Sequence, residues 1–391
     1  MKPSNICLVT NIYGHGKPLS DVGTSLALAI QKMDFVCELD IITHFRDGGN
    51  IRFSEKVQLQ SILDPSNPIS YIRAYFLLRN KKYDRVIFNS MPTSQGGETL
   101  SNLLYLCLPI VVSLVSHTKT SVLYHNSPFL NDVKNLGYSS NADKLKGFIL
   151  RYIERMMFLT SEVFFLLDNY TQKIRKKFPT SRIQNIKGGS INAFPTLYLN
   201  GVLETPLIIR ESPSRNTFRV LLYGIWGPQK NLEIALEAIK NLNDSGIKME
   251  CILAGGPNVN FPDAMGRYLE IEERYANYLS KVEGYVEEKN IIQLFSNCDI
   301  IVLPYRVPGG FSGVLSIAMF FSLCIILPEF PEYVEQCSDY NFVSFIPTNY
   351  NHSDISRQLA HITRCVDKRA IIMRPKSEFE KFCSEIRKML T

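Results

Sequence analysis

The stretch that most constrains the fold runs from Val282 to Glu335. It reads as a helix, the apolar strand CDIIVLPY, a loop rich in Gly, Pro and Ser, an apolar helix that begins near Ser312, and the buried strand CIILPEF. This order places a glycine-rich loop and a helix N-terminus at the carboxyl end of a strand. Ligands of open α/β sheets bind at that end, and unpaired N–H groups of a helix N-terminus attract phosphate. The stretch therefore predicts a site for an anionic ligand in an α/β fold.

The rest of the chain repeats the alternation of apolar strands and helical patterns, which favours parallel sheets connected by helices. A chain of 391 residues is too long for one comfortable core. The segment Leu203–Thr217 has two prolines and mixed charge, and it predicts a linker. We therefore expect a first domain at residues 1–202, the linker at 203–217, a second domain at 218–375, and a charged amphipathic helix at 376–391.

Composition indicates a cytoplasmic protein. The chain opens without a signal-peptide pattern, and its nine cysteines form no CxxC pair. The longest apolar run, Leu103–Val115, contains a proline and is too short to cross a bilayer, so it predicts a buried helix. These features leave a peripheral contact with a membrane open.

Charge is shared unevenly along the chain. Residues 1–200 carry 23 Lys and Arg against 14 Asp and Glu, whereas the remainder carries 20 against 23. A basic first half can face anionic lipid or an anionic acceptor, or it can be an ordinary solvated surface. The helix predicted at Lys144–Met157 leaves the same choice. Its apolar stripe, flanked by Lys and Arg, suits either the core or the surface of an anionic membrane.

The segment GIWGPQKNLEIALEAI, from Gly224, closes a strand and opens a helix. Pro228 suits the first helical turn, and Lys230 is expected in that same turn. The helix dipole disfavours a cation at this end, and a bound anion would remove the conflict. Lys230 is therefore a candidate phosphate ligand, and the alternative is an exposed surface lysine.

Ser312 is the predicted N-cap of a helix at 313–321. The backbone N–H groups of Gly313, Val314 and Leu315 are then expected to take phosphate oxygens. Gly310, in the preceding loop, allows close approach of the backbone to a ligand.

Other candidates also follow strands. His125 ends the strand TSVLYHN, where it is either functional or structural. Gly14 and Gly16 form the loop after the first strand, but a full GxGxxG is absent, which argues against a dinucleotide enzyme. Trp226, the single tryptophan, either walls the ligand or packs the domain. No DxD loop or His/Cys ligand spacing indicates a metal or another cofactor.

The segments from Gly224 and from Val282 resemble the donor-binding half of GT-B glycosyltransferases, most of all the retaining enzymes of family 4. The resemblance implies an α/β, GT-B fold, with two Rossmann-like domains whose parallel sheets face a central cleft. It also implies that the helix at 376–391 packs back on the first domain.

The resemblance assigns roles to several positions. Lys230 matches a lysine that contacts the donor diphosphate, and its partner arginine falls on Ile225, for which Arg306 is the candidate substitute. Gly284 and Tyr285 match a segment beside the nucleobase. The candidate loop and helix start match the donor-binding motif that comprises Gly310, Phe311, Ser312, Gly313, Val314 and Leu315.

His125 matches a histidine close to the transferred sugar. Two glutamates of the family pattern, which support the sugar and the ribose, fall on Gly309 and Ile317. The resemblance thus predicts a hexosyltransferase that moves a sugar, with retention, from a nucleotide-diphosphate sugar to a hydroxyl acceptor in a glycan, glycolipid or polysaccharide precursor. The missing charges leave two alternatives: a non-catalytic GT-B subunit that partners an active transferase, and a nucleotide-sugar epimerase.

Overall fold

The computed structural model describes residues 2–12, 20–44, 51–91, 99–116, 118–125, 127, 130, 141–204, 207–209, 217–258, 264–284, 286–365, 371–373 and 375–391. The chain divides into two compact units. Unit 1 comprises Met1–Pro195 and Ser377–Thr391, and unit 2 comprises Thr196–Lys376. The chain therefore leaves unit 1 once and returns to it at the C-terminus.

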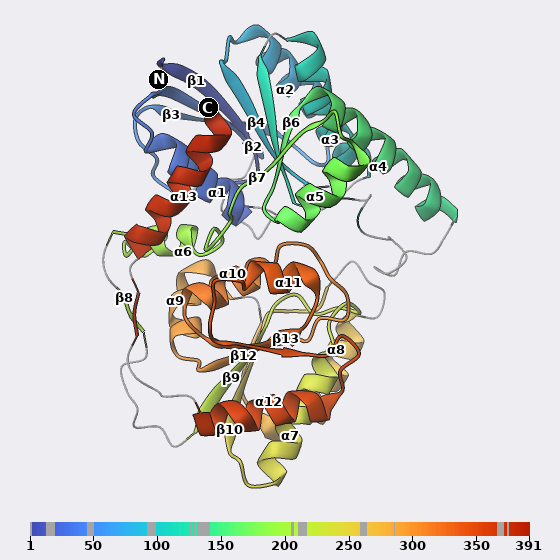
Figure 1. Cartoon of the computed structure of the whole chain (residues 1–391), viewed down its shortest axis with the longest axis vertical. Coiled ribbons are helices and arrows are strands. Elements are labelled where there is room, and N and C mark those ends of the chain that lie inside the picture. Colours follow the sequence, from blue (N-terminus) through green and yellow to red (C-terminus); the bar gives the residue numbers. More distant parts are fainter. Residues whose placement is uncertain are drawn as a thin grey trace. The chain divides into compact units, whose positions relative to one another are not determined.

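Unit 1 is built on a parallel sheet of seven strands in the order β3-β2-β1-β4-β5-β6-β7 (Figure 1). Its strands are β1 (Ser4–Val9), β2 (Val36–His44), β3 (Val57–Leu63), β4 (Arg85–Ser90), β5 (Lys119–Tyr124), β6 (Glu162–Phe165) and β7 (Arg182–Asn185). Its helices are α1 (Ser20–Gln31), α2 (Ile69–Asn80), α3 (Thr99–Val115), α4 (Asn141–Thr160), α5 (Asp168–Lys177) and α13 (Pro375–Leu390).

Unit 2 has a second parallel sheet, in the order β11-β10-β9-β12-β13-β14. Its strands are β9 (Phe218–Tyr223), β10 (Met249–Ala254), β11 (Leu279–Glu283), β12 (Ile300–Val302), β13 (Cys324–Pro328) and β14 (Val343–Ile346). Its helices are α7 (Leu232–Asp244), α8 (Ala264–Arg274), a 3₁₀ turn η2 (Ala276–Tyr278), α9 (Glu288–Ser296), α10 (Gly313–Phe320), α11 (Pro331–Gln336) and α12 (His352–Cys365).

Short elements join the units. Helix α6 (Phe194–Leu199) spans the first crossing, and β8 (Leu207–Ile209) pairs antiparallel with β15 (Ile371–Met373). The sequence indicated neither β8 nor β15, and it also gave no sign of β3, which is a half-exposed edge strand.

The C-terminal helix α13 belongs to unit 1, as the resemblance implied. Phe379 and Phe382 are buried, and their rings lie 5.0 and 5.5 Å from the ring of Phe194. The carboxylate of Glu385 accepts a hydrogen bond from the N–H of Lys187 (3.2 Å). Burial of apolar side chains, including Ile386 and Met389, stabilises this helix on the first unit.

The strand order of each sheet reverses at one point. In unit 1 the chain moves from β1 outward to β3 and then returns to β4, beside β1; in unit 2 it moves from β9 outward to β11 and returns to β12, beside β9. Loops that follow the two adjacent strands diverge to opposite faces at such a point and leave a crevice outside the carboxyl ends, where α/β proteins bind ligands. The candidate residues Lys230 and Arg306 follow β9 and β12, and His125 follows β5.

Candidate functional site: the ends of β9 and β12

In unit 2, the loops after β9 and β12 are joined by backbone hydrogen bonds. Lys230 and Tyr305 form an antiparallel bridge. On one side of this bridge, the N–H of Arg306 donates a hydrogen bond to the carbonyl of Gln229 (2.9 Å). On the other side, the N–H of Asn231 donates to the carbonyl of Pro304 (2.7 Å). These bonds hold residues 229–231 in an extended ladder, so α7 begins only at Leu232. The expectation that Pro228 and Lys230 lie in the first helical turn is therefore wrong.

The side chain of Lys230 turns back over the end of β9. Its ammonium lies 5.4 Å from the ring centroid of Trp226 and 5.5 Å from that of Tyr305, distances at which a cation is attracted to the face of a ring. Gly224 leaves room for it, because a Cβ at that position would lie 2.3 Å from Lys230 Nζ. The ammonium forms neither a hydrogen bond nor an ion pair with any residue that the structure describes.

Burial among these rings lowers the pKa of Lys230 from its usual 10.5 to about 8. Desolvation disfavours the charged form, and no described carboxylate offsets it. A phosphate that entered beside Nζ would supply the missing counter-charge and raise this pKa again. Lys230 is thus not the exposed surface lysine of the alternative interpretation, and it stays a candidate phosphate ligand.

Trp226 is buried in the core of unit 2, and it also lines a cavity there. Only 4% of it is exposed, and its indole N–H donates to the carbonyl of Ala254 at 3.2 Å. Its own N–H donates to the carbonyl of Gly256 (2.8 Å). The packing role expected from the sequence is confirmed, and the role of walling a ligand stays a prediction, which its place in a cavity lining supports.

A cavity of about 810 Å³ opens at this point of unit 2, a volume that suits a small-molecule ligand. Lys230, Trp226 and Arg306 line it, together with Arg267 and Tyr350. Arg306 is exposed and brings a second cation to the same cavity as Lys230. The structure thus places the candidate substitute for the missing arginine on the same cavity as the lysine, while the residues of the α10 start are absent from the lining.

The start of α10 is capped as the sequence predicted, with one correction. Ser312 is the N-cap, and its hydroxyl accepts a hydrogen bond from the N–H of Leu315 at 3.2 Å. The Leu315 N–H is therefore not free for phosphate, because the cap takes it. The N–H groups of Gly313 and Val314 have no partner among the described residues and remain the candidates.

The loop before α10 is held in place by side chains from the next helix. The N–H of Ser312 donates to Gln336 Oε1 (2.9 Å), and Gln336 Nε2 returns a bond to the Ser312 carbonyl (2.9 Å). Gly310 is buried and has φ +82°, a conformation that favours glycine. Phe311 beside it is half-buried. These contacts orient the first turn of α10 before any ligand arrives.

Tyr305 connects the two halves of the site, and sequence reasoning missed it. Its ring lies beside Lys230, while its hydroxyl is 2.9 Å from the Ser312 hydroxyl at the cap of α10. Burial raises the pKa of Tyr305 to about 12, so the phenol stays protonated. The signal was present in the sequence, since Tyr305 ends the LPY motif at the carboxyl end of a strand.

Two glycines bring the loops after β9 and β10 into direct contact. Gly255 has φ +93°, and a Cβ on it would lie 2.0 Å from the carbonyl oxygen of Gly224. The N–H of Gly255 also donates to the carbonyl of Gly284, an exposed residue, at 2.8 Å. Gly284 is thus placed at the same edge of the sheet as Lys230, while Tyr285 lies outside the described residues.

Replacing Gly255 with alanine is expected to lower the free energy of unfolding by at least about 2 kcal/mol, because the new Cβ meets backbone atoms and the φ angle is strained. Gly256 provides a matched control. A Cβ on Gly256 would meet nothing within 4 Å. Urea unfolding should separate the variants, with Gly256→Ala close to wild type. Equal midpoints for the two variants would contradict the close approach at Gly255.

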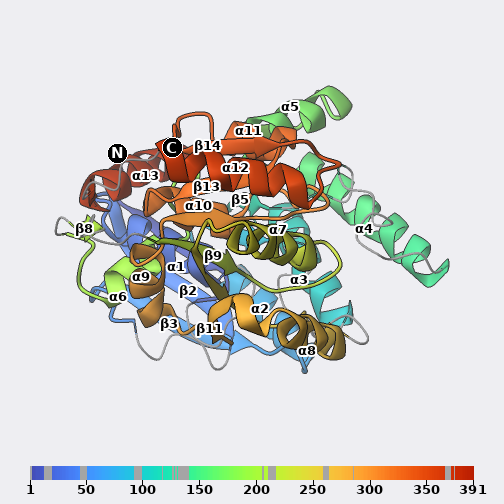
Figure 2. The same ribbon diagram turned by 90° about the horizontal axis from the view of Figure 1, so that it is seen from below.

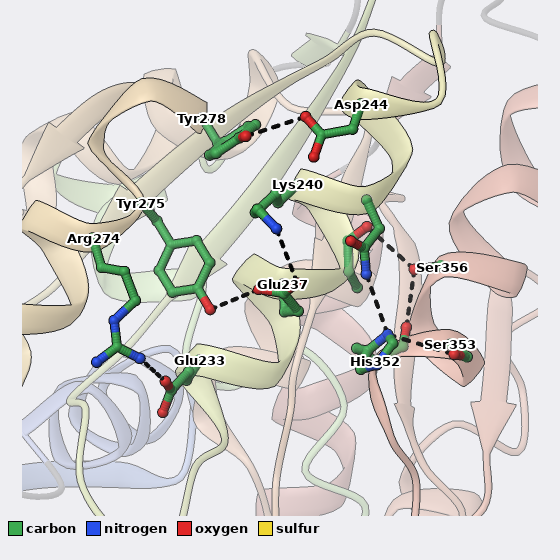
Figure 3. Close-up of polar contacts among 12 residues, drawn as sticks. Glu233, Glu237, Lys240, Asp244, Arg274, Tyr275, Tyr278, His352, Ser353 and Ser356 are labelled. Carbon is green, nitrogen blue, oxygen red and sulfur yellow. Dashed lines mark hydrogen bonds and ion pairs between the residues drawn. The ribbon is translucent and has the colours of Figure 1, made fainter.

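A polar network on the outer side of α7 fastens the helix that follows the lysine loop (Figure 3). Tyr275 donates to Glu237 (2.9 Å) and Tyr278 donates to Asp244 (3.1 Å), while Arg274 pairs with Glu233. These bonds tie the end of α8 and the η2 turn to α7. We assign the network a structural role.

In unit 1, His125 lies directly after β5 and takes part in a chain of hydrogen bonds across the sheet edge. His125 Nε2 is 2.7 Å from Asn89 Oδ1, and Asn89 Nδ2 donates to Thr10 Oγ1 (2.9 Å). Thr10 in turn donates to the carbonyl of Asn11 (3.0 Å). These directions make His125 Nε2 the protonated nitrogen and leave Nδ1 as an acceptor. No described residue bonds to Nδ1.

Burial lowers the pKa of His125 to about 3, so the ring is neutral at physiological pH. The side chain is nonetheless partly accessible. A neutral imidazole with a fixed tautomer and a free lone pair can accept a hydrogen bond from a hydroxyl group. Gly14 and Gly16, predicted to lie in the loop after β1, are outside the described residues.

Comparison with known proteins bears on the fold and on the family of the second unit. Residues 206–374 match the family described as "Glycosyl transferases group 1". No curated protein matches the sequence. Among solved structures, HepE of Anabaena, in complex with UDP and glucose, superposes with a TM-score of 0.64 at 13% identity, over 99% of each chain.

Two further structures share the fold. Sucrose-phosphate synthase of Thermosynechococcus elongatus has a TM-score of 0.65 at 13% identity, over 98% of this chain and 94% of its own. UDP-GlcNAc 2-epimerase of Neisseria meningitidis, bound to UDP-GlcNAc, has a TM-score of 0.58 at 12% identity, over 99% of each chain. The fold is that of GT-B proteins, and the match to the glycosyl transferases group 1 covers residues 206–374, which is less than half of the chain.

Proposed function

We propose that the protein transfers a hexosyl group, with retention of configuration, from a nucleotide-diphosphate sugar to a hydroxyl acceptor. The observation that carries the proposal is the Lys230 ammonium, which has no described counter-ion and is held between Trp226 and Tyr305 at the reversal point of the second sheet. This position lies within the region that matches the glycosyl transferases group 1. The acceptor belongs to a glycan, a glycolipid or a polysaccharide precursor.

The chemistry requires stabilisation of the leaving diphosphate. Departure of the nucleotide concentrates negative charge on the phosphate oxygens, and fixed donors at that point lower the barrier most. Lys230 and the N–H groups of Gly313 and Val314, which have no partner among the described residues, supply such donors, and Arg306 adds a second cation. In this proposal they neutralise the charge without a metal ion.

His125 contributes from unit 1 as a neutral acceptor. Because its Nε2–H is engaged by Asn89, the lone pair of Nδ1 is available to a substrate hydroxyl. Its low pKa excludes a role as a proton donor in the physiological range. We therefore assign His125 to orienting a hydroxyl rather than to general acid catalysis.

A second candidate function is that of a non-catalytic subunit. The position of the family arginine holds Ile225, which is 62% exposed, and that of one family glutamate holds Ile317, which is 4% exposed within α10. Neither can contact a nucleotide as a charged residue would. The fold shared with UDP-GlcNAc 2-epimerase keeps epimerisation as a third outcome to test.

The test is incubation of the pure protein with UDP-, GDP-, ADP- and dTDP-hexoses, first alone and then with a panel of polyprenyl-phosphate-linked and free oligosaccharides. Release of free nucleotide that depends on an acceptor is expected for one donor class. Conversion of the donor sugar without an acceptor would indicate the epimerase. Tight nucleotide binding with no turnover, or no binding at all, would indicate the non-catalytic subunit.

A further inference from the structure

The outer face of helices α2, α3 and α4 in unit 1 is unusually apolar. These helices lie side by side, α2 against α3 and α3 against α4. Twelve of the eighteen large hydrophobic side chains that are exposed in the described part of the chain lie on them: Ile69, Ile72, Phe76, Leu100, Val111, Leu114, Val115, Leu145, Phe148, Ile149, Tyr152 and Leu159. Large exposed apolar side chains gathered on adjoining helices are a mark of an interaction surface, so the face is expected to meet another phase or molecule.

On helix α4, large apolar side chains face solvent while an acidic side chain is buried. Leu145, Phe148 and Tyr152, which were open to interpretation as core, are 61–64% exposed. The opposite side of the helix packs on the sheet and includes Glu154, which is 1% exposed, and Phe158, which is fully buried. The core interpretation of the stripe is therefore wrong for its first half. In both views the first turns of α4 extend past the end of α3 (Figures 1 and 2).

The exposed charges on this face have one sign. Arg73 and Arg79 on α2, and Arg155 on α4, are exposed, and Arg151 is partly exposed. None of the four makes a hydrogen bond or an ion pair with another described residue. Helix α3 contains no charged residue, and the described side chains of α2 and α4 include one acid, the buried Glu154.

We propose that this face, the outer surface of α2, α3 and α4, docks on an anionic lipid bilayer. Apolar side chains enter the boundary between headgroups and acyl chains, and the unpaired arginines contact the headgroup phosphates. A helix of 20 residues, such as α4, spans about 30 Å in the plane of the surface. A second copy of the chain fits less well, because a two-fold contact would bring the arginines of the two copies together.

This proposal concerns where the protein works and stands independently of its reaction. In the described part, each helix is too short or too polar to cross a bilayer. Docking would therefore be peripheral and reversible, driven jointly by apolar burial and by charge.

The test is flotation of the full chain with vesicles of pure phosphatidylcholine and with vesicles that contain phosphatidylglycerol. Binding to the anionic vesicles is expected, with loss at high salt. The combined change Leu145→Ser, Phe148→Ser and Tyr152→Ser should weaken binding by at least about tenfold. Arg151→Gln with Arg155→Gln should weaken it less and reduce its salt dependence.

Met265→Ser with Leu269→Ser is the matched control, because these two α8 side chains are 53% and 52% exposed in unit 2. It should bind vesicles as wild type does. Thermal unfolding checks that the α4 variant still folds. Absence of wild-type binding, or equal binding by the α4 variant, would overturn the proposal. A concentration-dependent dimer that the α4 changes abolish would assign the face to a second copy instead.

Discussion

Replacing Lys230 with alanine is expected to lower kcat/KM for the sugar donor by about 10²–10³. Loss of a charge-assisted contact to a buried anion costs about 2–5 kcal/mol, and each 1.4 kcal/mol is a factor of ten. The ammonium has no described counter-ion, so alanine removes a ligand contact rather than a structural ion pair. Steady-state release of nucleotide measures the effect.

Lys240→Ala is the matched control for this variant. Lys240 belongs to α7, and its ammonium pairs with Glu237 at 3.2 Å on the outer side of the helix. It should retain wild-type turnover. Equal activity of the Lys230→Ala and Lys240→Ala variants would contradict the assignment of Lys230 to the diphosphate site.

The pKa of about 8 gives Lys230 a further signature. In the free protein the ammonium loses its proton as the pH rises through 8, so affinity for a diphosphate should fall above that pH. An arginine stays charged over the whole range, and in Lys230→Arg the fall should disappear. The stability of the ligand-free protein changes with pH in the opposite direction to the affinity. Because the folded pKa lies below 10.5, the ligand-free protein should gain stability between pH 8 and 10.5.

Replacing His125 with alanine is expected to lower kcat by about 10², with nucleotide affinity changed less than twofold. The ring offers a neutral acceptor to a substrate hydroxyl, and a lost preorganised hydrogen bond at a reacting group costs this order of rate. We propose that the nucleotide is bound by unit 2, so binding of the nucleotide alone should be spared. Single-turnover rates measure the loss in kcat, and calorimetry measures the affinity for the nucleotide.

Asn89→Ala tests whether the tautomer of His125, which the bond to Asn89 fixes, matters for turnover. Without Asn89 Oδ1 the ring loses the bond that keeps its proton on Nε2. We expect about a tenfold loss in kcat and no new ionisation near neutral pH, because burial keeps the pKa of His125 near 3. The exposed His352 supplies the control, His352→Ala. Equal rates in His125→Ala and His352→Ala would make His125 a structural residue.

Much of the fold follows from local patterns in the sequence. Parallel strands buried on both faces are short apolar runs, so CDIIVLPY and CIILPEF identified β12 and β13 directly. Edge strand β3 escaped because its sequence, VQLQSIL, mixes polar and apolar residues on a half-exposed strand. Strands β8 and β15 were not predicted because each has only three residues, too few to show the alternation that identifies a strand, and the two lie far apart in the sequence.

The candidate site was predictable where it depends on strand ends and was not where it depends on tertiary contacts. His125 and the Ser312 cap lie where the sequence placed them. The start of α7 was misplaced because the bond from Asn231 to Pro304 joins two loops far apart in sequence. The periodicity of α4 revealed a stripe but could not say which side faces the sheet, and there the buried side includes Glu154.

The central claim is that unit 2 binds a nucleotide diphosphate at Lys230. Calorimetric titration of UDP, GDP, ADP and dTDP into the wild-type chain, Lys230→Arg and Lys230→Ala at pH 7 tests it most directly. The account predicts micromolar binding of one nucleotide by wild type, a modest loss in Lys230→Arg and a loss of at least about 100-fold in Lys230→Ala. Equal affinities of wild type and Lys230→Ala, or no binding of any of the four nucleotides by wild type, would contradict it.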